Sequence, residues 1–236
     1  MVTLSFVSKS SSLLEALRNG KDCPVCLLCE EDLRSFYTWY FNEYYNDPVW
    51  ILKILDSRGF CNKHSWDLIC MGNDHHMSLV YEHLVKSTLV KLERLSKELK
   101  KFELRSRVKK IINKKHLQEI TKQLQPDEVC PICRTIFDKT AIWIENLLAN
   151  LNDDEINELY LMSYGLCINH FSQAFKSASP EVAELLIQKQ VEVLRKLDSD
   201  LEECSRKLDY RYSHEPKGEE QTAWIRAIKF FVGKEL

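Results

Sequence analysis

Apolar residues recur along this chain at the three- and four-residue steps that are typical of one face of an α-helix. Two long stretches repeat the same steps of 4, 3, 3, 4 and 3 residues: Val85, Leu89, Leu92, Leu95, Leu99 and Phe102, and then Ile187, Val191, Leu194, Leu197, Leu201 and Cys204. No stretch alternates apolar and polar residues between turn signals, as a strand would. The pattern predicts an all-α fold in which two long helices each present an apolar seam to another helix.

Shorter helices are marked by the residues at their ends. In the segment NDPVWILKILDSRG, Asp47 suits the N-cap, Pro48 the first turn and Gly59 the position just past the helix end. The segment NDDEINELYLMSYG has the same organisation, with Asn152 as the cap and Gly165 as the stop. These signals predict two short helices, each ending in a glycine turn.

Two short motifs occur twice. The letters CPVC at 23–26 return as CPIC at 130–133, and GFCNKH at 59–64 returns as GLCINH at 165–170. The first motif is displaced by 107 residues and the second by 106, so the two copies stay in register. A long apolar helix follows in both copies. We interpret this register as an internal duplication of one helical unit.

The duplication suggests boundaries along the chain. We expect a first helical metal-binding repeat over 1–110, a second over 111–208, and a C-terminal tail with a short helix over 209–236. No linker rich in Gly, Ser or Pro separates the two homologous repeats. Because compact domains are usually joined by such linkers, we expect the repeats to share one helical core.

Composition narrows the class of protein. Of the 236 residues, 44% are hydrophobic and 29% charged, a balance typical of globular rather than disordered chains. Gly and Pro number only six each, which agrees with long helices. The formal net charge of −2 gives no sign of a polyanionic partner for the whole chain. Without a membrane-length apolar run or a secretory signal pattern, the sequence leads us to expect a cytoplasmic protein with no membrane contact.

The repeated motifs carry the residue types that bind zinc. Zn²⁺ takes four nitrogen or sulfur ligands in a tetrahedron, and a CxxC or CxxH motif offers two of them one turn apart. In a reducing compartment, nine cysteines are more often ligands or buried thiols than disulfides. We expect each repeat to close its own Cys3His site, giving two zinc ions per chain: Cys23, Cys26, Cys61 and His64, and then Cys130, Cys133, Cys167 and His170. A closed shell of four protein ligands favours a structural role.

Two other chemistries remain open for these cysteines. The first is an iron–sulfur cluster, since Cys29 extends the first motif to C-x2-C-x2-C, although the second repeat has Ile136 at that place. The second is a redox-active dithiol, because a CPxC pair at a helix N-terminus has thiols of lowered pKa. Dithiol chemistry usually resides on a strand–helix unit, which the pattern does not predict here. Zinc is the leading interpretation and the cluster is its alternative.

The motifs resemble those of a known family. Together with the tail KLDYRYSHEPKGEEQTAWIRAIKFFVG, the pairing of CPxC with GxCxxH is similar to a family of uncharacterised prokaryotic proteins of about this length. The resemblance extends from the first CPxC to the tail. It implies a helical, cytoplasmic, metal-binding protein of unassigned function, and it supplies no catalytic residues.

A basic segment lies between the repeats. Residues 91–116 contain eleven Lys or Arg and three Glu, and four of the cations fall on one helical stripe: Arg94, Lys97, Lys101 and Arg105. Such a stripe can contact nucleic acid phosphates. The plainer interpretation, which we favour, is a solvated outer face of a long helix. No aromatic residue is interleaved along the stripe to stack on bases, which argues against single-strand binding.

The tail concentrates charge in a turn-rich segment, in Asp209, Arg211, His214, Glu215 and Arg226. These residues either form a pocket for a small or anionic ligand or tie the last helix to the body through ion pairs, and we favour the ion pairs. We expect the last helix to be anchored by its large apolar residues: Trp224, Ile228 and Phe231.

Two function classes follow from these features. A third metal site at His75, His76 and His83 is one further interpretation, but the start of a helix explains these residues as well. The sequence has no Gly-rich phosphate loop, nucleophile elbow or HExxH motif, so a non-enzymatic role is favoured over an enzyme. The protein is then either a metal-stabilised module that binds a protein partner, itself or nucleic acid, or a metal centre that acts as a redox relay or sensor.

Overall fold

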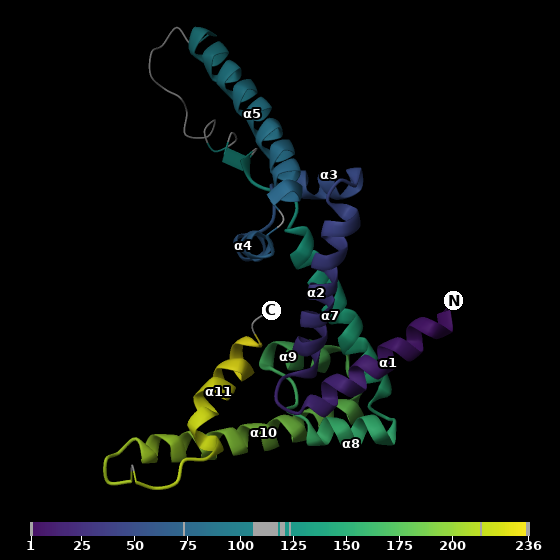
Figure 1. The fold of residues 1–236 in the computed structure, drawn as a ribbon, viewed down its shortest axis with the longest axis vertical. Coiled ribbons are helices and arrows are strands. Elements are labelled where there is room, and N and C mark those ends of the chain that lie inside the picture. Colours follow the sequence, from purple (N-terminus) through teal and green to yellow (C-terminus); the bar gives the residue numbers. More distant parts are fainter. Residues whose placement is uncertain are drawn as a thin grey trace. The chain divides into compact units, whose positions relative to one another are not determined.

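The computed structural model describes residues 2–72, 74–105, 118, 121–122, 124–212 and 214–234, and the side chains of 2–10, 99 and 101–105 lie outside this description. Regular structure in these residues is helical and includes no strand, as the apolar spacing predicts (Figure 1). A π-helical turn η1 (Tyr40–Tyr44) follows α2, and a 3-10 turn η2 (Glu219–Thr222) precedes α11. The α-helices are α1 (Val2–Asn19), α2 (Pro24–Trp39), α3 (Pro48–Asp56), α4 (Asn62–Cys70), α5 (Asp74–Arg105), α7 (Pro131–Asn150), α8 (Asp154–Met162), α9 (Ile168–Ser177), α10 (Pro180–Lys207) and α11 (Ala223–Val232).

The helices form two compact units that interleave along the chain. The first unit consists of Met1–Leu33 and Asp138–Leu236, and the second of Arg34–Phe137. The chain leaves the first unit along α2 and returns to it along α7, since both helices have residues in both units. This differs from the single shared core that the sequence led us to expect.

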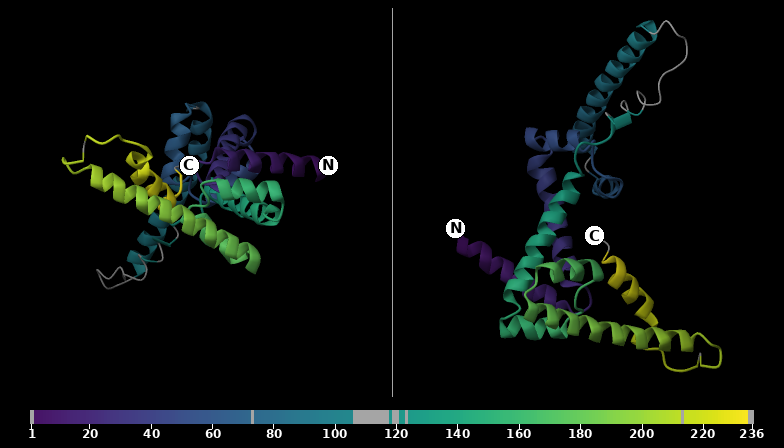
Figure 2. Two further views of the ribbon diagram at one scale, coloured as in Figure 1. Left: turned by 90° about the horizontal axis from the view of Figure 1, so that it is seen from below. Right: turned by 180° about the vertical axis from the view of Figure 1, so that it is seen from behind.

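In the first unit, several helices pack on the long helix α10. α9, η2 and α11 each contact α10, and α11 also contacts α9. Both views in Figure 2 show α11 doubling back from the loop at the end of α10. At the other side of this unit α1 contacts α8, and an ion pair of 2.8 Å between Arg18 and Glu155 joins them.

The face of α11 that packs inward is not the one that its largest side chains predicted. Trp224, Ile228 and Phe231 are 55%, 52% and 61% exposed. Ala223 and Phe230 are buried instead, in a cluster with Leu197 of α10. The helix is apolar on more than one face, and the small alanine allows the close approach to α10 that a tryptophan would prevent. The expected anchor was therefore wrong.

The second unit is built around an aromatic cluster. Tyr40 is fully buried and its ring lies 6.0 Å from that of Phe36 and 5.5 Å from that of Phe60. The helix that follows, α3, starts as predicted, because the carboxylate of Asp47 accepts hydrogen bonds from the backbone N–H groups of Val49 and Trp50 at 2.7 and 3.2 Å. α3 then packs against α5.

The apolar seams predicted for the long helices are only partly covered. On α5, Leu95 is buried, but Val85, Leu89 and Leu92 are exposed, while the side chains of Leu99 and Phe102 lie outside the described part. On α10, Leu197 is buried and Ile187, Val191 and Leu194 are more than a third exposed. The expectation that each whole seam faces another helix was wrong. Among the described helices none is long and apolar enough to cross a membrane.

Candidate metal centres

Each CPxC motif lies at the start of a helix. Pro24 begins α2, and the backbone N–H of Leu27 closes the first turn on the carbonyl of Cys23 at 3.1 Å. Pro131 begins α7 in the same way, with the N–H of Arg134 on the carbonyl of Cys130 at 3.0 Å. One turn separates the two thiols of each motif, so both lie on the same side of the helix. The positive end of the helix dipole favours thiolates there.

Each GxCxxH motif turns the chain with its glycine and then starts a helix. Gly59 and Gly165 have φ of 98° and 76°, in the left-handed region that favours glycine. Cys61 is the N-cap of α4 and Cys167 is the N-cap of α9. The histidine follows three residues later, one turn along the new helix, and lies on the same side as the cysteine. Gly59 is thus confirmed as a helix stop, since its N–H donates to the carbonyl of Ile54 at 2.8 Å. Gly165 was predicted as a stop as well, but α8 ends earlier, at Met162 with the extended Ser163 as its C-cap, so Gly165 turns the chain without ending the helix.

A buried glutamine fixes the backbone beside Cys167. The side-chain oxygen of Gln190 on α10 accepts a hydrogen bond from the N–H of Leu166 at 3.1 Å, and its amide nitrogen donates to the carbonyl of Leu166 at 2.7 Å. A Cβ at Gly165 would lie 2.6 Å from that oxygen, so this position requires glycine for space as well as for its φ. Gln190 thus supports the loop that presents Cys167.

Four ligand atoms meet in the first unit: those of Cys23, Cys26, Cys167 and His170, all within 4.8 Å of one another. The sulfur of Cys26 lies 3.8 Å from that of Cys167. The Nδ1 atom of His170 lies 3.4 Å from the sulfurs of Cys23 and Cys26 and 3.3 Å from that of Cys167. We call this group site 1.

A second group of four meets in the second unit: Cys61, His64, Cys130 and Cys133, again within 4.8 Å. The sulfurs of Cys61 and Cys133 are 3.7 Å apart. The Nδ1 atom of His64 lies 3.2, 3.4 and 3.7 Å from the sulfurs of Cys61, Cys133 and Cys130. We call this group site 2. Both candidate Cys3His groups thus exist, and their eight residues are those that the sequence singled out.

The partners within each group differ from the expected ones. We expected each CPxC to pair with the GxCxxH that follows it. In the structure the first CPxC meets Cys167 and His170, and the second CPxC meets Cys61 and His64. After Cys26 the chain runs along the 16 residues of α2, about 24 Å, and α3 offers only nine residues, about 14 Å, for a return before Cys61. The chain comes back to the first unit along α7. The within-repeat pairing was therefore wrong.

The separations fit a single tetrahedral ion. Zinc–sulfur bonds of 2.3 Å and zinc–nitrogen bonds of about 2.05 Å place two sulfurs about 3.8 Å apart and a sulfur and a nitrogen about 3.5 Å apart. The sulfur–sulfur distances of 3.8 and 3.7 Å match the first value, and the sulfur–nitrogen distances of 3.2–3.7 Å surround the second. The donor set therefore suits a metal ion that binds thiolates and imidazole.

The protonation of site 1 reflects three crowded thiols. Burial raises the pKa of Cys23, and the hydrogen bond from Cys26 to Cys167 raises the pKa of Cys26 to about 12. The same contacts from Cys23 and Cys26 lower the pKa of Cys167 well below its usual range. A divalent ion bound at site 1 would displace the thiol protons and bind all three sulfurs as thiolates.

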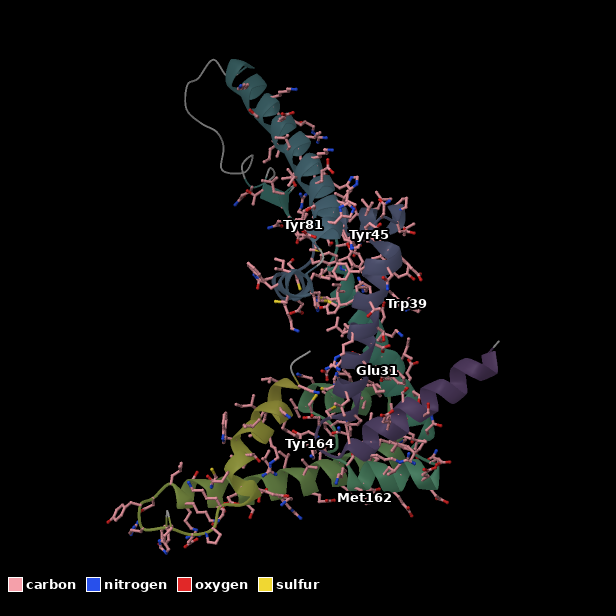
Figure 3. The ribbon with its side chains drawn as sticks, viewed as in Figure 1. Glu31, Trp39, Tyr45, Tyr81, Met162 and Tyr164 are labelled. Atoms are coloured by element: carbon pink, nitrogen blue, oxygen red, sulfur yellow. The ribbon has the colours of Figure 1, made fainter. Side chains whose placement is uncertain are left out.

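Site 2 has the same kinds of ligand as site 1, but its side chains are more exposed to solvent. Burial, followed by the charge of Cys130, raises the pKa of Cys133 to about 12, and burial lowers the pKa of His64. A neutral imidazole with a free ring nitrogen is the form that binds a metal. The residue after His64 is held by two hydroxyl contacts. The hydroxyl of Ser65 donates to the carbonyl of Phe60 at 3.1 Å, and it lies 3.1 Å from the hydroxyl of Tyr81, a residue labelled in Figure 3.

The two sites differ in exposure. In site 1 the three cysteines Cys23, Cys26 and Cys167 are 3%, 2% and 1% exposed. In site 2, Cys133 is exposed and Cys61 is half-buried, while His64 and Cys130 are buried. Solvent and competing ligands therefore have a direct approach to site 2 that site 1 does not offer.

The C-terminal segment covers site 1. A Cβ at Gly233 would lie 3.6 Å from the sulfur of Cys26 and 3.8 Å from that of Cys167, so the backbone after α11 passes directly over both atoms. The backbone N–H of Lys234 donates to the Cys26 sulfur and offsets a small part of the rise in the pKa of that thiol, whose main cause is the hydrogen bond to Cys167. The sequence analysis missed this contact, although a glycine just after an apolar helix is a signal for a helix end near other backbone.

Other cysteine and histidine candidates lie outside both groups. Cys29 is fully buried and its sulfur lies 3.2 Å from the hydroxyl of Thr140, so it does not extend the first motif to a third ligand. The ring of His76 lies 3.9 Å from that of Tyr45. His75, His76 and His83 form no metal-binding group among the described residues. The third metal site is not supported.

The basic stripe is described only in part. Arg94 and Lys97 are exposed on α5, and Arg94 forms an ion pair with Glu98 at 3.3 Å. The side chains of Lys101 and Arg105, and all of 106–116, lie outside the described residues. A phosphate-binding role of this stripe therefore stays a prediction.

Most of the named tail residues form ion pairs, either with one another or with α10. Arg211 forms an ion pair with Asp209 at 2.6 Å, Glu215 pairs with Arg206, and His214 is exposed. Arg226 on α11 forms an ion pair with Asp200 at 2.9 Å. The ion-pair interpretation thus describes this segment, and of the named tail residues Arg226 also lines a pocket, considered below.

The chain matches a family model over residues 10–235, a family of unknown function designated DUF6062. It therefore belongs to that family, over the two metal-ligand groups and the tail alike. No curated protein and no solved structure shows significant similarity to it. The resemblance that the motifs suggested is thus to a family whose function is unassigned, and the function has to be argued from the sites.

Proposed function

We propose that this member of DUF6062 is a zinc-stabilised helical scaffold, in which one Cys3His-bound zinc closes each of the two units and the helices present a surface to a binding partner. The observation that carries the proposal is the closed set of four protein ligands in each group, with all donor atoms within 4.8 Å. Four protein ligands leave no coordination position for a water or a substrate. Closed sites of this kind are structural.

The contribution of each zinc to folding is large because its ligands are far apart in the chain. In site 1 the ion joins residues 141 to 147 positions apart, and in site 2 it joins Cys61 to Cys133, 72 positions apart. Such a link is absent from the unfolded chain, so the free energy of zinc binding becomes free energy of folding. Zinc would therefore determine whether the two units assemble at all.

An iron–sulfur cluster is the alternative, and the distances argue against it. A cluster distributes its cysteine ligands over two or more irons, so that sulfurs on different irons lie well apart. Here all four donor atoms of each group lie close enough to bind one ion. The third cysteine of the first motif, Cys29, is directed to Thr140 instead. The tetrahedral fit therefore favours zinc.

The metal content of anaerobically purified, untagged protein tests this proposal. We expect two zinc atoms per chain, no acid-labile sulfide and no absorption in the visible range. Iron with labile sulfide would make the cluster the correct interpretation, and a metal-free folded protein would overturn the metal sites altogether. Cys70→Ser provides the control, since Cys70 is exposed and lies outside both groups; it should retain two zinc atoms.

A further inference from the structure

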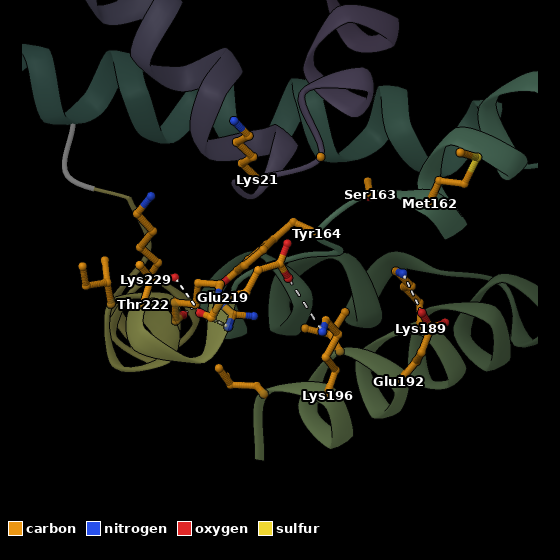
Figure 4. A pocket seen from close by; sticks show the side chains of 15 residues that line it. Lys21, Met162, Ser163, Tyr164, Lys189, Glu192, Lys196, Glu219, Thr222 and Lys229 are labelled. Carbon is orange, nitrogen blue, oxygen red and sulfur yellow. Dashed lines mark hydrogen bonds and ion pairs between the residues drawn. The ribbon is translucent and has the colours of Figure 1, made fainter. Parts of the chain in front are cut away.

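A pocket lies in the first unit, and no metal-ligand candidate lines it. Its volume is about 620 Å³, within the usual range for small-molecule sites. The end of α8, the middle of α10 and the η2–α11 segment form its walls, together with the turn after α1. Figure 4 shows that Lys189 and Lys196 come to it from the same helix, α10, whereas Lys21 and Lys229 come from two other segments.

The lining carries an excess of positive charge. Five cationic side chains line it: Lys21, Lys189, Lys196, Arg226 and Lys229. Only two carboxylates do so, Glu192 and Glu219. A concave surface of one sign, with low-dielectric protein behind it, concentrates ligands of the opposite charge. The pocket therefore attracts anions, although the chain as a whole has a net charge of −2.

Three of the four lining lysines already have carboxylate partners, and Arg226 shares Asp200 with one of them. Lys189 pairs with Glu192 at 3.2 Å, Lys196 with Asp200 at 3.5 Å, and Lys229 with Asp22 at 2.6 Å. Their role in the pocket is to set the local potential. The two other cations can still donate hydrogen bonds to a ligand.

Lys21 and Arg226 are these two cations. The ammonium group of Lys21 has no ion pair with any residue in the described part of the chain. Arg226 donates from one Nη to Asp200 at 2.9 Å and to the carbonyl of Glu219 at 3.1 Å, while its other Nη donates to no residue in the described part of the chain. This second Nη can donate a charged hydrogen bond to an anion in the pocket.

Apolar side chains complete the lining: Met162, Val193, Leu197 and Ile225. From the charge, the free donors and these walls, we propose that the pocket binds a small organic anion. Its carboxylate or phosphate head lies toward Arg226 and Lys21, and its apolar body packs against Val193, Leu197 and Ile225. This assignment uses no metal ligand, so it stands independently of the zinc proposal.

Calorimetric titration of the full-length, metal-loaded protein with octanoate, octyl phosphate and octanol tests the assignment. We expect at least one of the two anions to bind at a stoichiometry of one, with an affinity that falls as salt rises, and octanol to bind at least about tenfold more weakly because charged hydrogen bonds are lost. The stronger of the two anions identifies the head group. Octanol binding as well as the anions, or no binding by either anion at millimolar concentration, would overturn the proposal.

Matched variants locate the binding. Lys21→Met should weaken the anion about tenfold or more, whereas Lys217→Met, which removes an exposed lysine outside the lining, should not. Val193→Trp should block the pocket while leaving every cation in place. Ile228→Ser alters the exposed apolar face of α11 and should leave binding unchanged. If Ile228→Ser abolishes binding and Lys21→Met does not, the ligand lies on the outer face of α11 and the assignment is wrong. A variant is included in the comparison only if its melting temperature and zinc content equal those of the original protein.

Discussion

The sulfur of Cys26 lies 3.8 Å from the sulfur of Cys167, although 141 residues separate them in the sequence. This contact joins a cysteine of the first CPxC to one of the second GxCxxH. The corresponding contact in the other unit joins Cys61 of the first GxCxxH to Cys133 of the second CPxC. Each site thus takes two ligands from a CPxC and two from the GxCxxH of the other copy. Loss of a ligand from one copy therefore leaves the two ligands from the other copy with an incomplete site.

Replacement of one ligand should remove one zinc and leave the other. For Cys167→Ser we expect elemental analysis to give one zinc per chain instead of two, because site 2 shares no ligand with site 1. The loss of a structural ion should lower the melting temperature by about 5–10 °C, as expected for a few kcal/mol in a chain of this size. Circular dichroism measures the melting. A variant that keeps both zinc atoms would contradict the assignment of Cys167.

The two ions should leave at different rates. Because Cys133 is exposed while the cysteines of site 1 are buried beneath the C-terminal segment, we expect a chelator such as EDTA to remove zinc in two phases of equal amplitude. Stopped-flow with a zinc-sensitive dye follows the release. Cys130→Ser should lack the fast phase, whereas Cys23→Ser should lack the slow one. The reverse assignment would show that exposure does not control release.

Gly233 should be sensitive to any side chain. Gly233→Val forces an L-residue to φ of 86°, which costs about 1–2 kcal/mol, and it also directs methyl groups at the sulfurs of Cys26 and Cys167. We expect weaker zinc binding at site 1, measured by competition with a chromophoric chelator. Gly72→Val is the matched control, because Gly72 has φ of 74° and nothing within 4 Å of its Cβ position. It should lose stability without losing zinc affinity.

Gln190 should matter for stability without touching a metal. Gln190→Leu leaves the buried N–H and carbonyl of Leu166 without partners, at a cost of at least about 2 kcal/mol. Urea unfolding at fixed zinc concentration measures this loss. Gln188→Leu, on the exposed side of the same helix, should change the unfolding free energy by less than about 0.5 kcal/mol. Equal effects of both variants would argue against the role of Gln190.

Local sequence signals predicted local structure well. Asp47 caps α3, Gly59 ends it in the left-handed region, and all eight metal-ligand candidates fall into two groups. At α8 the signals were less exact, because Asp153 caps it in place of Asn152 and it ends before Gly165. These features depend on neighbours within one or two turns. A capping carboxylate or a glycine acts on backbone groups a few residues away, so the sequence alone carries the information.

Long-range pairing was beyond the same reasoning. The motif spacing is equally compatible with a site inside one repeat and a site across two, and only the lengths of α2 and α7 decide between them. On α11, Phe230 and Phe231 are adjacent and equally apolar, yet one is buried and the other exposed. The choice depends on which face meets α10, and Ala223 and Ala227 decide it by allowing close approach. Such choices need the partner surface as well as the sequence.

The crossed pairing of the motifs has a consequence for synthesis on the ribosome. Cys23 and Cys26 emerge first, but Cys167 follows 141 residues after Cys26, which takes on the order of ten seconds at ordinary translation rates. The interval is shorter for site 2, since Cys133 follows Cys61 by 72 residues. During these intervals the nascent chain carries incomplete sets of ligands. Any thiol-binding metal can bind to their thiols, and any oxidant can oxidise them. For the zinc-stabilised scaffold proposed above, the order of the motifs along the chain therefore makes correct assembly depend on the reducing power and the free zinc of the compartment where translation takes place.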